Sequence, residues 1–147
     1  MRFLDNLSSL LEVVGTKDKQ SVTNEDINKL MQLSSIKIPD DYLSFLREIN
    51  GLELESIELG YTLYLWSVQE IEFFYQDQGR ILKMEKDTLI IGDDLGDLCL
   101  FYGNGNEGFG IYYSEMSGIF YQRAHKVCDS LTELLIEGKG LDHIFYN

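Results

Sequence analysis

A glycine-rich string, GNGNEG at residues 103–108, is the first of three stretches whose residue types could do chemistry. Its Gly-x-Gly-x-x-Gly pattern holds a dinucleotide pyrophosphate when a helix follows, because the amides at the helix start bind the phosphates. The residues that follow, Phe109 to Tyr113, are typical of a strand, and a kinase-type glycine loop would need catalytic loops that the remaining chain does not contain. Residues 87–122 also contain no Lys or Arg to balance phosphate charge. We therefore predict a hairpin or bulged hairpin in which Asn104-Gly105 and Glu107-Gly108 supply positive φ angles.

The other two stretches have the residue types of a metal site and of a nucleophile with its base. The segment Asp93-Asp94-Leu95-Gly96-Asp97 places three carboxylates within five residues, but its spacing departs from that of a calcium-binding EF-hand loop, so we interpret these residues as turn acids. His125 and Cys128 would meet if they lay on one helical turn, yet no third group that would orient the histidine is recognisable. No combination of nucleophile, base and oxyanion donor stands out, and we expect no enzymatic activity, no metal and no cofactor.

The charge of the chain points to a class of partner. Asp and Glu number 25 against 12 Lys and Arg, which gives a net charge of −13. Residues 48–122 hold 14 of the acids and only three bases, Arg80, Lys83 and Lys86. Such a field repels nucleic acid and anionic lipid and attracts a basic protein, although solubility alone is the alternative reason for it. We expect no nucleic-acid partner and no membrane partner.

The composition describes one folded domain, residues 1–147. Hydrophobic residues make up 44% of the chain, with one proline and no low-complexity segment, as in ordered globular proteins. No apolar run approaches the roughly 20 residues that span a bilayer, and the N-terminus lacks the features of a signal peptide. Two cysteines are too few for a disulfide framework. We expect a cytoplasmic protein that is a monomer or a weak homodimer.

Helical spacing of apolar residues and capping signals predict helices at both ends of the chain. Thr23 with Asp26 three residues later resembles a capping box, and Asn50-Gly51 ends a helix that begins at Pro39. A further helix follows Ser67, which is a favoured N-cap residue. The remaining expected helices cover residues 3–14 and 130–137, and the one begun by Thr23 reaches Ile36.

Short strands are predicted in the middle of the chain, where β-branched and aromatic residues alternate with turn residues. They cover Tyr61–Trp66, Thr88–Ile91, Leu98–Tyr102, Phe109–Ser114 and Ile119–Arg123. Strands clustered between helical ends favour an α+β fold, with an antiparallel or mixed sheet of about five to six strands packed against N-terminal and C-terminal helices.

Four segments together resemble the SUKH superfamily. Residues 38–46 (IPDDYLSFL) followed by Asn50-Gly51 are similar to its Pro-x-x-Tyr-x-x-Phe-Leu…Asn-Gly helix, and residues 91–97 (IGDDLGD) to its Ile-Gly-x-x-x-Gly-Asp turn. Residues 64–71 and the closing helix from Ser130 also match, so the resemblance spans residues 38–136, with 1–37 as the N-terminal helical part of the same domain. The chain departs from the family pattern at Leu95, where glycine is common, and at Leu131, where phenylalanine is usual.

The resemblance implies an α+β fold and a function in binding proteins. Many bacterial members are immunity proteins that neutralise a toxin domain, often a nuclease, and fungal relatives regulate cell-wall synthesis. We therefore predict a non-catalytic immunity protein whose partner is a basic toxin domain; a housekeeping scaffold or regulator with an endogenous partner is the alternative. A hydrolase that uses Cys128 with His125 is a third hypothesis.

The predicted partner-binding surface combines acidic residues with aromatic anchors, because tyrosine and tryptophan are favoured at protein interfaces. Its candidate residues are Asp93, Asp94, Asp97, Glu107 and Glu115, with Trp66, Tyr102 and Tyr113 as the anchors.

Overall fold

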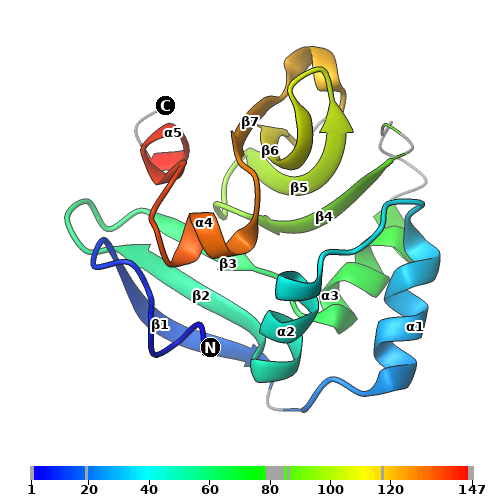
Figure 1. The fold of residues 1–147 in the computed structure, drawn as a ribbon, viewed down its shortest axis with the longest axis horizontal. Helices are drawn as coiled ribbons and strands as arrows, with labels where there is room; N and C mark the ends of the chain where they lie inside the picture. Colours follow the sequence, from blue (N-terminus) through cyan, green and yellow to red (C-terminus); the bar gives the residue numbers. More distant parts are fainter. Residues whose placement is uncertain (1, 19, 79–84, 86, 117, 146–147) are drawn as a thin grey trace.

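The fold is a single antiparallel sheet covered by short helices (Figure 1). The computed structural model describes residues 2–18, 20–78, 85, 87–116 and 118–145. Within these residues seven strands pair in chain order, each antiparallel to the next: β1 Leu11–Asp18, β2 Asn50–Ser56, β3 Thr62–Leu65, β4 Thr88–Asp93, β5 Leu98–Gly105, β6 Gly108–Glu115 and β7 His125–Cys128. The α+β class is confirmed; the sheet is antiparallel throughout and has more strands than the five to six predicted.

Five α-helices accompany the sheet within the same residues: α1 Asn24–Leu33, α2 Asp40–Glu48, α3 Val68–Phe73, α4 Leu131–Leu135 and α5 Leu141–Phe145. A π-helical turn (η1, Phe74–Gln78) continues α3, and a 3₁₀ turn (η2, Tyr121–Arg123) precedes β7. The predicted caps are confirmed, since Thr23 and Asp26 form a capping box at the start of α1 and Ser67 caps α3. Helix α1 ends at Leu33, before the expected Ile36, and Pro39 is the N-cap of α2.

The prediction of a helix over residues 3–14 was wrong, because residues 11–14 belong to the edge strand β1 and no helix forms before it. Leu11 lies opposite Ser56 and Glu12 opposite Glu55 in the ladder with β2. The apolar spacing of the segment fits a helix, and pairing with a neighbouring strand overrides that local pattern. Phe3 is buried ahead of the strand, and its backbone N–H donates to the carboxylate of Glu48 at 2.7 Å.

The strand expected at Ile119–Arg123 was also wrong, and the reason explains the glycine-rich string. The ring of Tyr121 packs on the β5 backbone, so a Cβ on Gly105 would lie 2.5 Å from that ring and one on Gly103 only 2.7 Å from the hydroxyl. The Tyr121 hydroxyl accepts the N–H of Asn104 at 2.8 Å. This contact holds the segment as the turn η2, and the last strand forms later, at β7.

The predicted hairpin at residues 103–108 is confirmed. Gly105 pairs with Gly108, and the two residues between them form the turn that joins β5 to β6. Gly108 has a φ of +90°, as predicted, whereas Gly105 does not have a positive φ. Gly105 instead provides room for the Tyr121 ring. The string therefore serves packing and turn formation, and no helix follows it to bind a phosphate.

The sheet divides into two halves that meet at a short junction. β1–β3 lie at the lower left of Figure 1 and β4–β7 at the upper right. Only Tyr64 with Asp93 and Leu65 with Gly92 pair across β3 and β4. A Cβ on Gly92 would lie 2.5 Å from the carbonyl oxygen of Tyr64, so the absence of a side chain there allows the two strands to approach.

The core lies between the sheet and the helices α2 and α4. Leu52, Leu54, Leu63 and Leu65 are almost completely buried on the inner side of β2 and β3. Helix α2 contacts both β2 and α4, and α4 and α5 contact β7. The carboxylate of Asp41 joins α2 to α4, because it accepts hydrogen bonds from the backbone N–H and the hydroxyl of Thr132 at 3.1 and 2.8 Å. These contacts place α2 and α4 on the inner side of β1–β3.

Candidate interaction surface

The outer side of β1–β3 carries a continuous set of acidic residues. In β2 the buried Leu52 and Leu54 alternate with the half-buried Glu53 and Glu55, because successive side chains of a strand point to opposite faces. The ladder aligns these residues with neighbours on the same side, which together form the acidic face: Glu12 on β1, Glu53 and Glu55 on β2, Tyr64 on β3 and Asp93 on β4.

The acidic face places like charges next to each other. Glu12 lies directly opposite Glu55, and Glu53 lies opposite Tyr64, which in turn lies opposite Asp93. Like charges at directly opposite positions destabilise an antiparallel pair, so the fold gains nothing from this arrangement. The three bases found in this acidic part of the sequence, Arg80, Lys83 and Lys86, lie outside the described residues.

The three predicted turn acids lie at the β4–β5 connection, and two of them hold the turn. Asp93 accepts the indole N–H of Trp66 at 3.1 Å and the N–H of Leu95 at 3.0 Å. Asp94 accepts the N–H groups of Gly96 and Leu98 through the same oxygen, Oδ1, at 2.8 and 3.3 Å. No cluster of metal-ligating side chains occurs among the residues that the structure describes. The interpretation as turn acids is confirmed for Asp93 and Asp94, whose carboxylates accept backbone N–H groups of the turn.

The structure groups four of the five candidate carboxylates and separates the fifth. Asp97 immediately precedes β5, and Glu115 lies opposite Leu98 at the end of β6, so both lie beside Asp93 and Asp94. Glu107 lies in the hairpin at the other end of β5, about 24 Å away at about 3.4 Å per residue. There its carboxylate accepts the backbone N–H of β7 residue 126 at 3.1 Å. Glu107 therefore does not share a surface with the other four.

The three predicted aromatic anchors lie in the core, so the prediction that they face solvent was wrong. Trp66 is 7% exposed and packs on Phe74 of η1 with ring centroids 5.3 Å apart. Tyr102 is 0% exposed, and its hydroxyl accepts the first N–H of α4, from Leu131, at 3.1 Å. Tyr113 is 5% exposed. Helices and turns cover both sides of the sheet at these positions, so alternation along the strands does not bring these rings to the surface.

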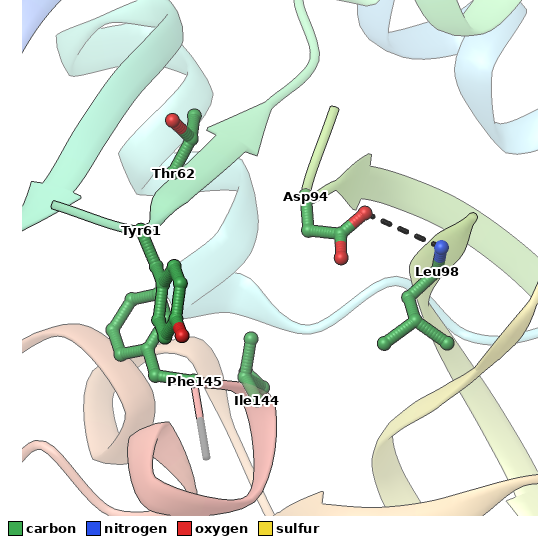
Figure 2. A pocket seen from close by; sticks show the side chains of 6 residues that line it. All are labelled: Tyr61, Thr62, Asp94, Leu98, Ile144 and Phe145. Carbon is green, nitrogen blue, oxygen red and sulfur yellow. Dashed lines mark hydrogen bonds between the residues drawn. The ribbon is translucent and has the colours of Figure 1, made fainter. Parts of the chain in front are cut away.

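A hollow opens at the end of the molecule where the β4–β5 turn lies. We call it the end hollow; it has a volume of about 270 Å³ and is lined by Tyr61, Thr62, Asp94, Leu98, Ile144 and Phe145 (Figure 2). The lining residues come from the start of β3, the β4–β5 turn and α5. Thr62 lies opposite Glu55 in the ladder, whereas Ile144 and Phe145 of α5 line the hollow from the inner side of the sheet, so the end hollow borders the acidic face only at Thr62.

The structure does not bring together His125 and Cys128, the two residues on which the hydrolase hypothesis depends. His125 and Cys128 lie on the strand β7, where residues three apart point to opposite faces, and not on a helical turn. The Cys128 thiol is buried and donates to the carbonyl of Ser130 at 3.3 Å. Burial raises the pKa of the Cys128 thiol to about 12, which disfavours the nucleophilic thiolate.

Sequence reasoning missed Glu12, Glu53 and Glu55 as a group. The strict alternation Leu-Glu-Leu-Glu at residues 52–55 is the signal of a strand with one buried and one exposed face, and it would have identified β2. With β2 unassigned, the acids of β2 had no common face to share. Tyr61 and Phe145 of the end hollow were not candidates either; Phe145 lies in α5, a helix that was not predicted.

Comparison with known families matches most of the chain. The model of the SMI1 / KNR4 family (SUKH-1) matches residues 21–137, which is 117 of the 147 residues. The match covers α1 to α4 and all of the sheet except β1. A comparison with curated proteins found no match. Within the described residues, no helix has the length and apolar character needed to cross a membrane.

Proposed function

Because the chain belongs to the SMI1 / KNR4 family (SUKH-1), we propose that it is a non-catalytic protein-binding domain that neutralises a basic toxin domain. The partner would carry a cationic cleft of the kind with which nucleases grip phosphate, and the protein would occupy that cleft in a one-to-one complex. It would act in the cytoplasm, where reduced thiols such as Cys99 and Cys128 persist.

The observation that carries the proposal is the acidic face. Glu12 and Glu55 are held opposite each other on a sheet side that helices leave open, at a cost to the fold. A cationic group of a partner placed against Glu12 and Glu55 would be attracted to both carboxylates and would offset their mutual repulsion. Opposite charges also steer association, which raises the association rate at low salt and favours the matching partner over others. A toxin inhibitor benefits from both effects, since it must bind before the toxin reaches its target.

The direct test is protection of cells. The protein is co-expressed with the toxin domain encoded beside its own gene, and survival is measured for the wild type and for the double charge reversal Glu53→Lys with Glu55→Lys. We expect the wild type to protect and the reversed variant to fail. The reversal at position 55 places a lysine opposite Glu12, which replaces a like-charge pair with an opposite-charge pair, and the melting temperature of the double variant shows whether it remains folded.

A matched control reverses a charge away from the acidic face. Glu25 is exposed on α1, and Glu25→Lys should leave protection unchanged. If the variant with reversed charges at Glu53 and Glu55 protects cells as well as the wild type does, the acidic face does not bind the toxin. If no toxin gene lies beside this one, the alternative of an endogenous partner bound through the same face would be favoured.

A further inference from the structure

The end hollow combines apolar walls with a single carboxylate, and this combination indicates what it binds. Figure 2 shows the ring of Tyr61 beside that of Phe145 on one side and Asp94 with Leu98 on the other. The two ring centroids are 6.4 Å apart at an interplanar angle of 33°. Tyr61 is 52% exposed, so much of its ring remains open to a ligand.

Asp94 has one oxygen available for a ligand. Its Oδ1 accepts the N–H groups of Gly96 and Leu98, whereas Oδ2 accepts no hydrogen bond within the described part of the chain. In Figure 2 this second oxygen points into the space between Ile144 and Leu98. The two hydrogen bonds at Oδ1 fix the carboxylate in place, so its other oxygen is positioned before any ligand arrives.

We propose that the end hollow receives one arginine side chain projecting from the basic partner. The guanidinium would stack on the Tyr61 ring and donate a hydrogen bond to Asp94 Oδ2, while its aliphatic stem would lie against Ile144 and Phe145. Arginine fits better than lysine because its planar, weakly hydrated cation stacks on aromatic rings. The volume of about 270 Å³ admits one long side chain and not a helix or a strand.

Other occupants fit the same walls less well. A purely apolar side chain would remove Asp94 Oδ2 from water and leave that oxygen without a hydrogen-bond donor, which is unfavourable for a charged group. An anion would be repelled by Asp94 and by Asp97 on the same turn. Thr62 lies opposite Glu55, so the hollow borders the acidic face at the start of β3, and a basic partner that covers this end of the sheet would supply the arginine.

The experiment titrates the full-length protein with blocked arginine, Nα-acetyl-arginine N-methylamide, and follows backbone amide shifts by NMR. The matched probe is the citrulline compound, which has nearly the same shape and no charge. We expect arginine to shift amides of residues 61–62, 94–98 and 141–145, and citrulline to leave them unmoved. Equal shifts from both compounds, or shifts confined to residues 53–55, would overturn the proposal.

Three variants locate the interaction. Asp94→Asn keeps the amide oxygen that holds the turn but removes the charge, and should weaken arginine binding at least about tenfold. Tyr61→Leu keeps an apolar wall and should weaken it about threefold. Asp142→Asn, an exposed residue of α5 that does not line the hollow, is the control and should change binding less than about twofold. An equal loss in Asp94→Asn and Asp142→Asn would mean that general charge, and not the hollow, attracts arginine.

This inference rests on the proposed function for its partner, but the two can fail separately. Protection that requires Glu53 and Glu55 and is unchanged by Asp94→Asn would remove the arginine site and leave the proposed function intact. Specific arginine binding by a protein that gives no protection would support the site and contradict the toxin partner.

Discussion

Replacing Glu55 with glutamine should stabilise the free protein, although it removes a residue that we place in the binding surface. Glu55 lies directly opposite Glu12 in the β1–β2 ladder, where Cβ atoms are about 4.5–5.5 Å apart. Cross-strand side-chain pairs contribute roughly 0.2–1 kcal/mol, and like charges destabilise by a similar amount. Relief of this repulsion should raise the melting temperature by about 1–3 °C for a chain of this size.

A double-mutant cycle separates this pair from the rest of the charge. Glu12→Gln, Glu55→Gln and the double variant are unfolded with heat and with urea at low salt and at 1 M salt. Each single change already removes the repulsion, so the double variant should be less stable than the sum of the two gains implies. The gain should shrink at 1 M salt, where the screening length falls to about 3 Å. Glu25→Gln is the control, because Glu25 lies 3.8 Å from Lys29 and its neutralisation should not stabilise the protein.

Two results would refute this reasoning. Strictly additive single effects would mean that the two carboxylates do not interact across the strands. A stability gain of the same size in Glu25→Gln would mean that net charge, and not the geometry of the acidic face, sets the effect. If the cycle behaves as expected, Glu55→Gln should also bind a basic partner more weakly, so that stability rises while affinity falls.

Two further predictions concern buried groups in the core. Tyr42→Phe should leave the free energy of unfolding unchanged or slightly higher, because the Tyr42 hydroxyl is buried without a hydrogen-bond partner among the described residues. Tyr102→Phe should lower the free energy of unfolding by about 1–3 kcal/mol, because the N–H of Leu131 loses its acceptor. Equal losses for the two variants in urea unfolding would contradict this. Burial raises the pKa of the Cys99 and Cys128 thiols to about 12 from an ordinary value of 9.0, so both should resist Ellman's reagent at pH 8 until the protein unfolds. The unfolded chain loses these protons first, so the stabilisation is complete below about pH 9 and is lost as the pH rises toward 12; Cys128→Ala should flatten this loss in pH-dependent unfolding.

The parts of the fold that could be predicted from the sequence are those that local chemistry determines. The capping box at Thr23 and the cap at Ser67 involve residues three apart, so the sequence contains the whole interaction. β1 could not be predicted in this way, because residues 11–18 become a strand only by pairing with residues 50–56, far along the chain. The turn at Tyr121 likewise depends on two glycines in another strand.

The residues of the candidate site also separate into those that local sequence predicts and those whose position depends on distant parts of the chain. The carboxylates at the β4–β5 turn could be predicted, since a run of acids after a buried strand indicates a turn. The error for Glu107 was avoidable, because the predicted strand Leu98–Tyr102 separates residues 93–97 from the hairpin at 103–108, and turns on either side of one strand lie at its opposite ends. Trp66 and Tyr102 were misplaced because their surroundings, the ring of Phe74 and the start of α4, come from other elements. Exposure of an aromatic residue depends on the whole fold, and a strand pattern alone does not decide it.

The segments that carry the family resemblance have structural tasks. Asn50 is buried and accepts the N–H of Val68 at 2.9 Å, Asp41 joins α2 to α4, and Gly92 allows β3 and β4 to meet. Asn50, Asp41 and Gly92 make contacts within the fold and are not available to a partner. The motif residues of the family therefore determine the fold and do not determine which partner is bound. That choice must then depend on residues outside the fixed motif positions. The acidic face and the end hollow meet this condition, because Glu12, Glu53, Glu55 and Tyr61 lie outside the motif segments and Asp94 occupies a variable position of the turn.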